Sequence, residues 1–77
     1  MKVTYDPDTD ILQIAFKGCV VEETTQITPG LILDYDEDGS LIGLELRKAS
    51  KKVDNPYAIA YVIGAANTDK PPVKESR

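Results

Sequence analysis

The 77-residue chain carries 13 acidic and 9 basic residues, no histidine and a single cysteine, which gives a formal net charge of −4. A chain of this length forms one domain at most and buries only about 60–65% of the surface that its unfolded form exposes, so the core is thin. No apolar run approaches the roughly 18 residues of a membrane span, no secretory signal is recognisable, and the lone Cys19 cannot form an internal disulfide; together these features predict a cytoplasmic protein.

Charge is distributed unevenly along the chain. Residues 1–46 hold ten acidic residues against two lysines, a net charge of −8, whereas residues 47–77 hold seven basic residues against three acidic ones, a net charge of +4. No continuous basic surface is indicated, which argues against nucleic acid as the main ligand. The cluster Arg47, Lys48, Lys51 and Lys52 is either a docking site for an acidic partner or a solvated connection.

The N-terminal residues predict a β-hairpin. Residues 2–5 alternate as a strand does, and residues 6–10 contain the proline and aspartates that form turns. Leu12, Ile14 and Phe16 then share one face at a period of two residues. A strand, an acidic turn and a second strand are the elements of a hairpin.

The hairpin pattern repeats thirty residues later. Residues 5–8 (Tyr-Asp-Pro-Asp) return as residues 35–38 (Tyr-Asp-Glu-Asp), and residues 11–14 return as residues 41–44. A solenoid would need three or more repeats, so two stacked hairpins are the simpler interpretation. Between the hairpins, polar, threonine-containing residues 22–26 predict an exposed edge strand or a connection.

The uncharged segment 57–66 allows two interpretations. Its apolar side chains fit one face of a helix, and the preceding Asp54-Asn55-Pro56 is typical of a helix start. Large side chains also occupy alternate positions, as they would on one face of a strand: Tyr57, Ile59, Tyr61 and Ile63. The alanines and the capping sequence favour the helix.

The predicted architecture is therefore α+β. We expect antiparallel β-hairpins, with about four strands in a meander, followed by one C-terminal helix. Residues 1–66 form the single β-rich domain, and the polar, proline-containing residues 67–77 form a disordered tail.

One acidic motif matches the EF-hand calcium loop. Asp34, Asp36, Asp38, Gly39 and Glu45 occupy its ligand and glycine positions. An EF-hand loop lies between two helices, however, and here a Thr-Pro-Gly sequence precedes the motif and an alternating strand pattern follows it. An extended strand would carry the glutamate roughly 15–20 Å beyond the turn, too far to close around one ion.

Weak calcium binding by the turn aspartates remains as an alternative function. The simpler interpretation is that these carboxylates accept backbone N–H groups of their own turns. The acidic turn residues are Asp6, Asp8, Asp36 and Asp38.

The composition offers little for catalysis. The chain has no histidine, no phosphate-binding glycine motif, and one cysteine, Cys19, which lacks an activating partner and is interpreted as a small packing residue. A domain this small also has little room for a cleft of a few hundred Å³. We therefore expect no enzyme activity, no cofactor and no metal site.

The uncharged segment 57–66 is the main candidate interface. A small sheet cannot cover all sides of such a helix, and exposed apolar patches usually mark interfaces. We expect a homodimer through this segment, or binding of a protein partner. The candidate interface residues are Tyr57, Ile59, Tyr61, Val62 and Ile63.

Two stretches of the chain resemble a known family. Residues 3–10 with Leu12 and Ile14, and the run of residues 28–46 with Ala49 and Ser50, are similar to small bacterial proteins grouped as domain of unknown function 2283. The resemblance implies a compact β fold with a C-terminal helical segment and no established activity. It also implies a small toxin-like, ribonuclease-fold companion, and hence an antitoxin-like role in which the acidic turns cover a basic cleft.

Overall fold

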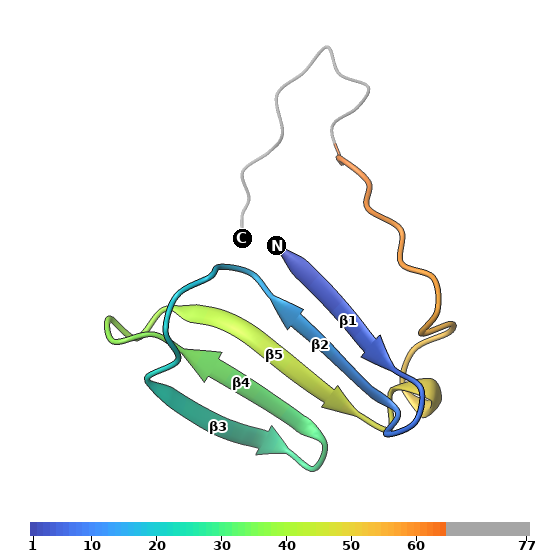
Figure 1. Cartoon of the computed structure of the whole chain (residues 1–77), viewed down its shortest axis with the longest axis horizontal. Helices are drawn as coiled ribbons and strands as arrows, with labels where there is room; N and C mark the ends of the chain where they lie inside the picture. The colour runs from blue at the N-terminus through green and yellow to red at the C-terminus, as the bar shows by residue number, and fades with distance from the viewer. Residues whose placement is uncertain (65–77) are drawn as a thin grey trace.

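The computed structural model describes residues 1–64, which form one antiparallel sheet of five strands (Figure 1). The strands are β1 (Lys2–Asp6), β2 (Ile11–Ala15), β3 (Glu23–Thr28), β4 (Leu31–Tyr35) and β5 (Leu41–Arg47), and a 3-10 turn, η1 (Ala49–Lys51), follows β5. The strand order is β1-β2-β5-β4-β3. The hairpin β4–β5 therefore joins the hairpin β1–β2 through the β2–β5 pair.

The predicted α+β meander is wrong in its strand order, its strand number and its helix. The sheet has five strands instead of about four, and no α-helix occurs within residues 1–64. The order departs from a meander because the connection of residues 16–22 passes the ends of β5 and β4 (Figure 1). The Glu22 N–H then donates to the Tyr35 carbonyl at 2.8 Å, which starts β3 on the outer side of β4. The polar stretch that contains β3 is thus an edge strand, one of the two expectations for it.

The C-terminal helix is absent from the described part of its predicted range, residues 57–64. Asn55 behaves as a cap, because its Oδ1 accepts the Tyr57 N–H at 3.0 Å, and the Ala58 N–H reaches the Asn55 carbonyl at 3.1 Å. The single turn does not continue. Starting a helix is unfavourable, short helices depend on packing, and β-branched and aromatic residues have modest helix propensity. The predicted boundary at residue 66 and the predicted tail 67–77 lie outside the described residues.

No helix that could span a lipid bilayer occurs in residues 1–64.

The thirty-residue repeat appears as two hairpins with the same register. Val3 pairs with Ile14 in the first hairpin, and Leu33 pairs with Leu44 in the second. Each partner of the second pair lies thirty residues beyond its counterpart in the first. An approximate two-fold axis normal to the sheet therefore relates the two hairpins.

The two hairpin turns also share their side-chain chemistry. Asp6 Oδ1 accepts the Asp8 N–H at 2.9 Å, and Asp36 Oδ1 accepts the Asp38 N–H at the same distance. These bonds are Asx turns, in which an aspartate replaces a backbone acceptor. The expectation that these aspartates bond their own turns is confirmed for Asp6 and Asp36.

The sheet has one polar and one apolar face. The polar face carries a row of paired residues that crosses all five strands. The members of this row are Thr4, Gln13, Glu45, Ile32 and Gln26. On the apolar face two rows run parallel to each other, and they contain most of the strands' large hydrophobic side chains.

The hydrophobic core is thin. Within residues 1–64 the buried apolar side chains are Leu12, Ile32, Ile42 and Ala49. No α-helix and no second sheet in this range covers the apolar face. The usual solution, in which a sheet buries its apolar face against another layer, is thus not completed by the described chain.

Candidate protein-interaction surface

The centre of the apolar face is a continuous row of side chains across neighbouring strands. Val3 pairs with Ile14, Ile14 with Leu44, and Leu44 with Leu33. Val3 is 40% exposed, and the other three are half-buried. We call these four residues the apolar row. Thr25 of β3 extends the row to the far edge of the sheet.

A second row lies beside the apolar row, towards η1. Its members are Tyr5, Leu12, Leu46 and Leu31. Tyr57 covers one end of it, with its ring centroid 5.2 Å from that of Tyr5 and the two rings at 79°. Next to this contact is an open hollow of about 470 Å³, lined by Val3, Leu12 and Ile59 among others. The second row is therefore only partly covered.

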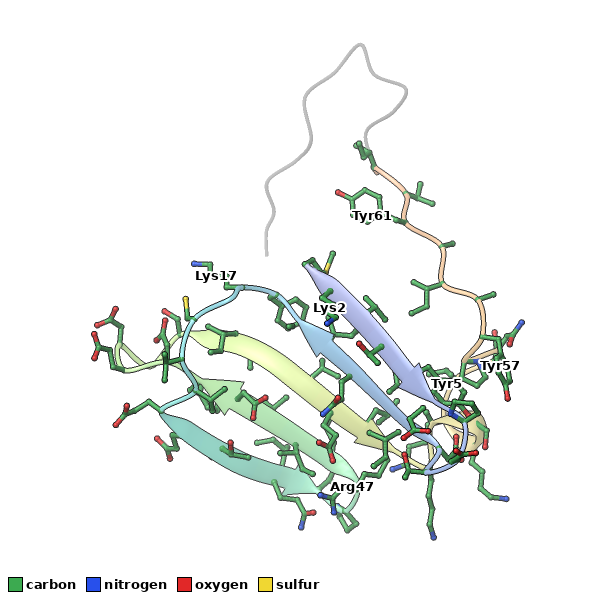
Figure 2. The ribbon with its side chains drawn as sticks, in the orientation of Figure 1. Lys2, Tyr5, Lys17, Arg47, Tyr57 and Tyr61 are labelled. Carbon is green, nitrogen blue, oxygen red and sulfur yellow. The ribbon has the colours of Figure 1, made fainter. Side chains whose placement is uncertain are left out.

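Residues 55–64, which we call the C-terminal arm, leave the sheet at Tyr57 (Figure 2). The arm has no regular secondary structure beyond its first turn. Its five large apolar side chains, the candidate interface residues of the sequence, are 56–79% exposed. Tyr57 lies against Tyr5, whereas Tyr61 lies away from the sheet (Figure 2). Their role in an interface stays a prediction.

The acidic turn residues do not form a common site. Asp6 and Asp8 belong to the β1–β2 turn, and Asp36 and Asp38 to the β4–β5 turn, at opposite ends of the sheet (Figure 1). Asp36 Oδ1 also accepts the Ser40 N–H at 2.9 Å. In the described range 1–64, no group of three or more His, Cys, Asp or Glu residues is placed to hold a metal ion.

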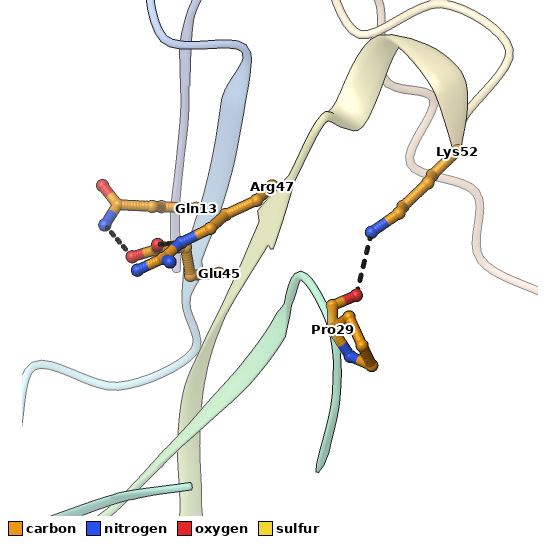
Figure 3. Close-up of polar contacts among 5 residues, drawn as sticks. All are labelled: Gln13, Pro29, Glu45, Arg47 and Lys52. Carbon is orange, nitrogen blue, oxygen red and sulfur yellow. Dashed lines mark hydrogen bonds and ion pairs between the residues drawn. The ribbon is translucent and has the colours of Figure 1, made fainter. Parts of the chain in front are cut away.

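The glutamate of the EF-hand match lies on a strand, as expected. Glu45 belongs to β5 and pairs with Ile32. Its carboxylate accepts from Gln13 Nε2 at 3.2 Å and from Arg47 Nε at 2.7 Å (Figure 3). This carboxylate thus ties β2 to β5 on the polar face.

Sequence reasoning missed a polar cluster around Asp10. The Asp10 carboxylate accepts the Tyr5 hydroxyl at 2.7 Å, the Ser50 hydroxyl at 2.6 Å and the Ser50 N–H at 2.9 Å. The Asp10 carbonyl accepts the Ala49 N–H at 3.0 Å. These bonds attach η1 to the first hairpin. The only signal in the sequence is a break in the repeat, since Ser40 occupies the position thirty residues beyond Asp10.

The same hydrogen bonds shift two pKa values. The Ser50 hydroxyl, followed by the Tyr5 hydroxyl and the Ser50 N–H, lowers the pKa of Asp10 by stabilising its carboxylate. The hydrogen bond to Asp10, with a smaller contribution from desolvation, raises the pKa of Tyr5 to about 12. Both shifts favour the pair of a neutral tyrosine and a charged aspartate.

The predicted basic cluster is divided between two sides of the sheet. Arg47 joins Glu45 and Gln13 on the polar face, whereas Lys52 lies on the other side of β5 (Figure 3). Lys52 Nζ donates to the Pro29 carbonyl at 3.3 Å. Lys48 has a left-handed backbone with φ 55° and immediately precedes η1 as its N-cap residue.

Cys19 is exposed, so its interpretation as a packing residue is wrong. It lies in the connection between β2 and β3, beside an open hollow that it shares with the acidic β4–β5 turn. A residue on a connection outside the sheet has little to pack against, and residue type alone does not reveal this.

Comparison with known proteins identifies a family. No curated protein and no solved structure matches the chain. The family model described as "Protein of unknown function (DUF2283)" matches residues 2–50, which is more than half of the chain and includes all five strands. The β fold agrees with the earlier resemblance, although the helical segment that the resemblance implied is absent from residues 57–64. The chain belongs to the DUF2283 family.

Proposed function

We propose that this protein is a non-catalytic, cytoplasmic module that assembles with a second copy of itself through the apolar face of its sheet. The supporting observation is the apolar row, Val3, Ile14, Leu44 and Leu33, which no other layer within residues 1–64 covers. A sheet with one apolar face becomes stable when that face packs on another layer. A second copy supplies such a layer, because two sheets pack face to face at about 10 Å.

The size of the apolar face fits this use. Five strands spaced about 4.8 Å apart, each with about five residues, span roughly 24 by 17 Å, or about 400 Å² per copy. The largest contiguous apolar patch of a typical soluble monomer covers about 300–600 Å² and is often functional. Because Tyr57 already covers part of the second row, two such faces together bury at most about 800 Å², whereas stable interfaces bury about 1,200–2,000 Å² in total. The exposed side chains of the C-terminal arm would supply the remaining area.

The proposal is tested by the molar mass in solution. Light scattering should give roughly twice the 8.4 kDa of one chain. Val3→Lys and Leu33→Lys place a charge in the apolar row, so each should yield a monomer with an unchanged circular dichroism spectrum. Gln13→Lys, on the polar face, is the matched control and should remain a dimer. A wild-type protein that is monomeric at about 100 µM would contradict the proposal, because even a weak specific dimer forms there.

Binding of a basic protein partner, as an antitoxin would do, is the second candidate function. The observation that favours it is the gathering of exposed carboxylates around the β4–β5 turn. Binding of a small basic ribonuclease-fold protein, the companion that the family resemblance implies, should weaken steeply as salt rises, because salt screens exposed charges. Calorimetry at two salt concentrations measures this, and no heat at low salt would exclude the role for that partner.

Weak calcium binding by the acidic turns has less support. Asp6 and Asp36 already accept backbone N–H groups, and the two turns lie at opposite ends of the sheet. We expect a calcium titration to release no heat below millimolar ion. Heat in the micromolar range would restore this alternative.

A further inference from the structure

We infer that two copies pack with their apolar faces together and their strands running in opposite directions across the interface, so that the acidic end of each copy lies beside the basic turn of the other. The acidic end consists of Glu22, Glu23, Asp36, Glu37 and Asp38, and the basic turn consists of Lys48, Lys51 and Lys52. This inference rests on the proposed self-association and adds its orientation.

The apolar face alone leaves the orientation open. The approximate two-fold axis normal to the sheet relates β1–β2 to β4–β5, and it passes between Ile14 and Leu44. A half-turn about this axis leaves the apolar row nearly unchanged. A second sheet would therefore fit almost equally well with its strands parallel or antiparallel to the first. The ends of the sheet, which differ, must decide.

The acidic end lies where the β4–β5 turn meets the start of β3. Glu22 is held there by its N–H bond to the Tyr35 carbonyl at 2.8 Å. Glu23 pairs with Tyr35 and lies two residues before Thr25, so it shares the apolar side of the sheet. No lysine or arginine occurs between residues 34 and 46. All five acidic residues except the half-buried Asp36 are exposed.

The basic turn lies at the opposite end of β5. Lys52 lies against the β3–β4 turn, where its ammonium donates to the Pro29 carbonyl at 3.3 Å. Figure 3 shows it on the other side of β5 from Gln13 and Glu45, which are polar-face residues, so it borders the apolar face. No acidic residue occurs between residues 46 and 53. The apolar face is thus bordered by Glu23 at one end of the sheet and by Lys52 at the other.

Opposite strand directions bring these two ends together. In a two-fold dimer each contact occurs twice, so both acidic ends would meet both basic turns. Parallel strands would instead place each acidic end beside Lys17 and Lys2 of the partner. Lys2 lies two residues before Thr4 and shares the polar side of β1, so it faces away from that interface. Charge complementarity at the rim of an interface fixes its register and orientation.

A pair of charge-reversed variants tests the orientation. One variant carries Glu37→Lys and Asp38→Lys, and the other carries Lys48→Glu and Lys52→Glu; Lys52→Glu alone replaces the second if circular dichroism shows a loss of structure. The first variant changes the net charge of the acidic end from −5 to −1, and the second changes that of the basic turn from +3 to −1. Each variant therefore loses charge complementarity in its own dimer, which should be about tenfold or more weaker than the wild type at low salt. Mixed in equal amounts, they should form heterodimers, because the unaltered basic turn of the first variant (+3) then meets the unaltered acidic end of the second (−5).

Sedimentation and native mass spectrometry measure these species. Gln26→Lys, on the polar face of β3, is the control and should leave the wild-type dimer unchanged. If both variants dimerise with the wild-type affinity, or if their mixture shows no preference for the heterodimer, the orientation is overturned and the self-association stands. A monomeric wild type would overturn both.

Discussion

Ile14 and Leu44, which occupy equivalent positions in the thirty-residue repeat, pair directly with each other between β2 and β5. A residue pairs with its own repeat equivalent only where a two-fold axis passes between the two. The flanking pairs obey the same symmetry, because Gln13 opposite Glu45 is exchanged with Ala15 opposite Gly43. The centre of the sheet is therefore the junction of two copies of one hairpin.

The Ile14–Leu44 junction should contribute a measurable pairwise energy. Ile14→Ala and Leu44→Ala should each lower the free energy of unfolding by about 1–3 kcal/mol, because both side chains are half-buried. Their combined effect should fall short of the sum by about 0.5–1 kcal/mol, since the cross-strand contact is lost only once. Urea titrations at one protein concentration measure this.

The control for this cycle combines Ile14→Ala with Ile32→Ala. Ile32 lies on the polar face, so the two effects should add to within about 0.5 kcal/mol. Additivity of Ile14→Ala with Leu44→Ala as well would show that the junction has no special role.

The hairpins could be predicted from the sequence, whereas their assembly could not. Alternation at a period of two residues and the Asx turns at Asp6 and Asp36 act within a few residues, so local sequence reports them. The β2–β5 pairing and the path of residues 16–22 depend on which strands meet in space. The helix predicted over residues 57–66 is absent from residues 57–64 for the same reason, because the capping bond at Asn55 forms but no packed surface in the described part of the chain extends the turn.

The candidate surface shows the same limit. The sequence identified the arm by its lack of charge, and the structure shows its side chains exposed. The apolar row was not predicted as a surface, because alternation in Ile14 and Leu44 signals a buried face and does not reveal that residues 1–64 contain no covering layer. The Asp10 cluster joins residues forty positions apart, and the break in the repeat at Asp10 is its only sign in the sequence.

The Asp10 cluster should make stability depend on pH at both extremes. The pKa of Asp10 is lowered on folding, so its contribution is present above the unfolded pKa of about 3.9 and is lost as pH falls through the folded pKa. The pKa of Tyr5 is raised to about 12, so its contribution is present below about pH 10 and is lost as pH rises towards 12.

Variants at Asp10 and Tyr5 separate the two ends of this profile. In urea titrations, Asp10→Asn should reduce the loss of stability in acid, and Tyr5→Phe should reduce the loss in base. Asp38→Asn is the matched control, because this exposed aspartate lies in the other hairpin turn. If the stability of Asp10→Asn falls in acid as steeply as that of the wild type, other carboxylates cause the acid sensitivity.

Gly30 and Gly39 form a matched pair for measuring the cost of positive φ. Their φ angles are 86° and 83°, a region that alanine adopts at a cost of about 1–2 kcal/mol. A Cβ at Gly39 would meet nothing within 4 Å, whereas one at Gly30 would overlap the Lys52 ammonium. That ammonium ends a flexible side chain and can move away. Thermal or urea unfolding should therefore show Gly30→Ala and Gly39→Ala to be destabilised within about 0.5 kcal/mol of each other. An additional loss above about 1 kcal/mol in Gly30→Ala would show that Lys52 is firmly held.

The exposed arm should strengthen self-association without being required for folding. Tyr61 and Val62 are 78% and 79% exposed, so Tyr61→Lys and Val62→Lys remove no buried contact within the chain. At protein concentrations low enough to keep the chains monomeric, both variants should melt at the same temperature as the wild type. If the arm adds apolar area to the interface, each should weaken the dimer about tenfold in sedimentation equilibrium, which corresponds to about 1.4 kcal/mol. Gln26→Lys adds the same charge on the polar face and should have no effect. If both arm variants dimerise with the wild-type affinity, the interface is confined to the sheet. The dimer would then bury no more surface area than the apolar faces of the two sheets provide.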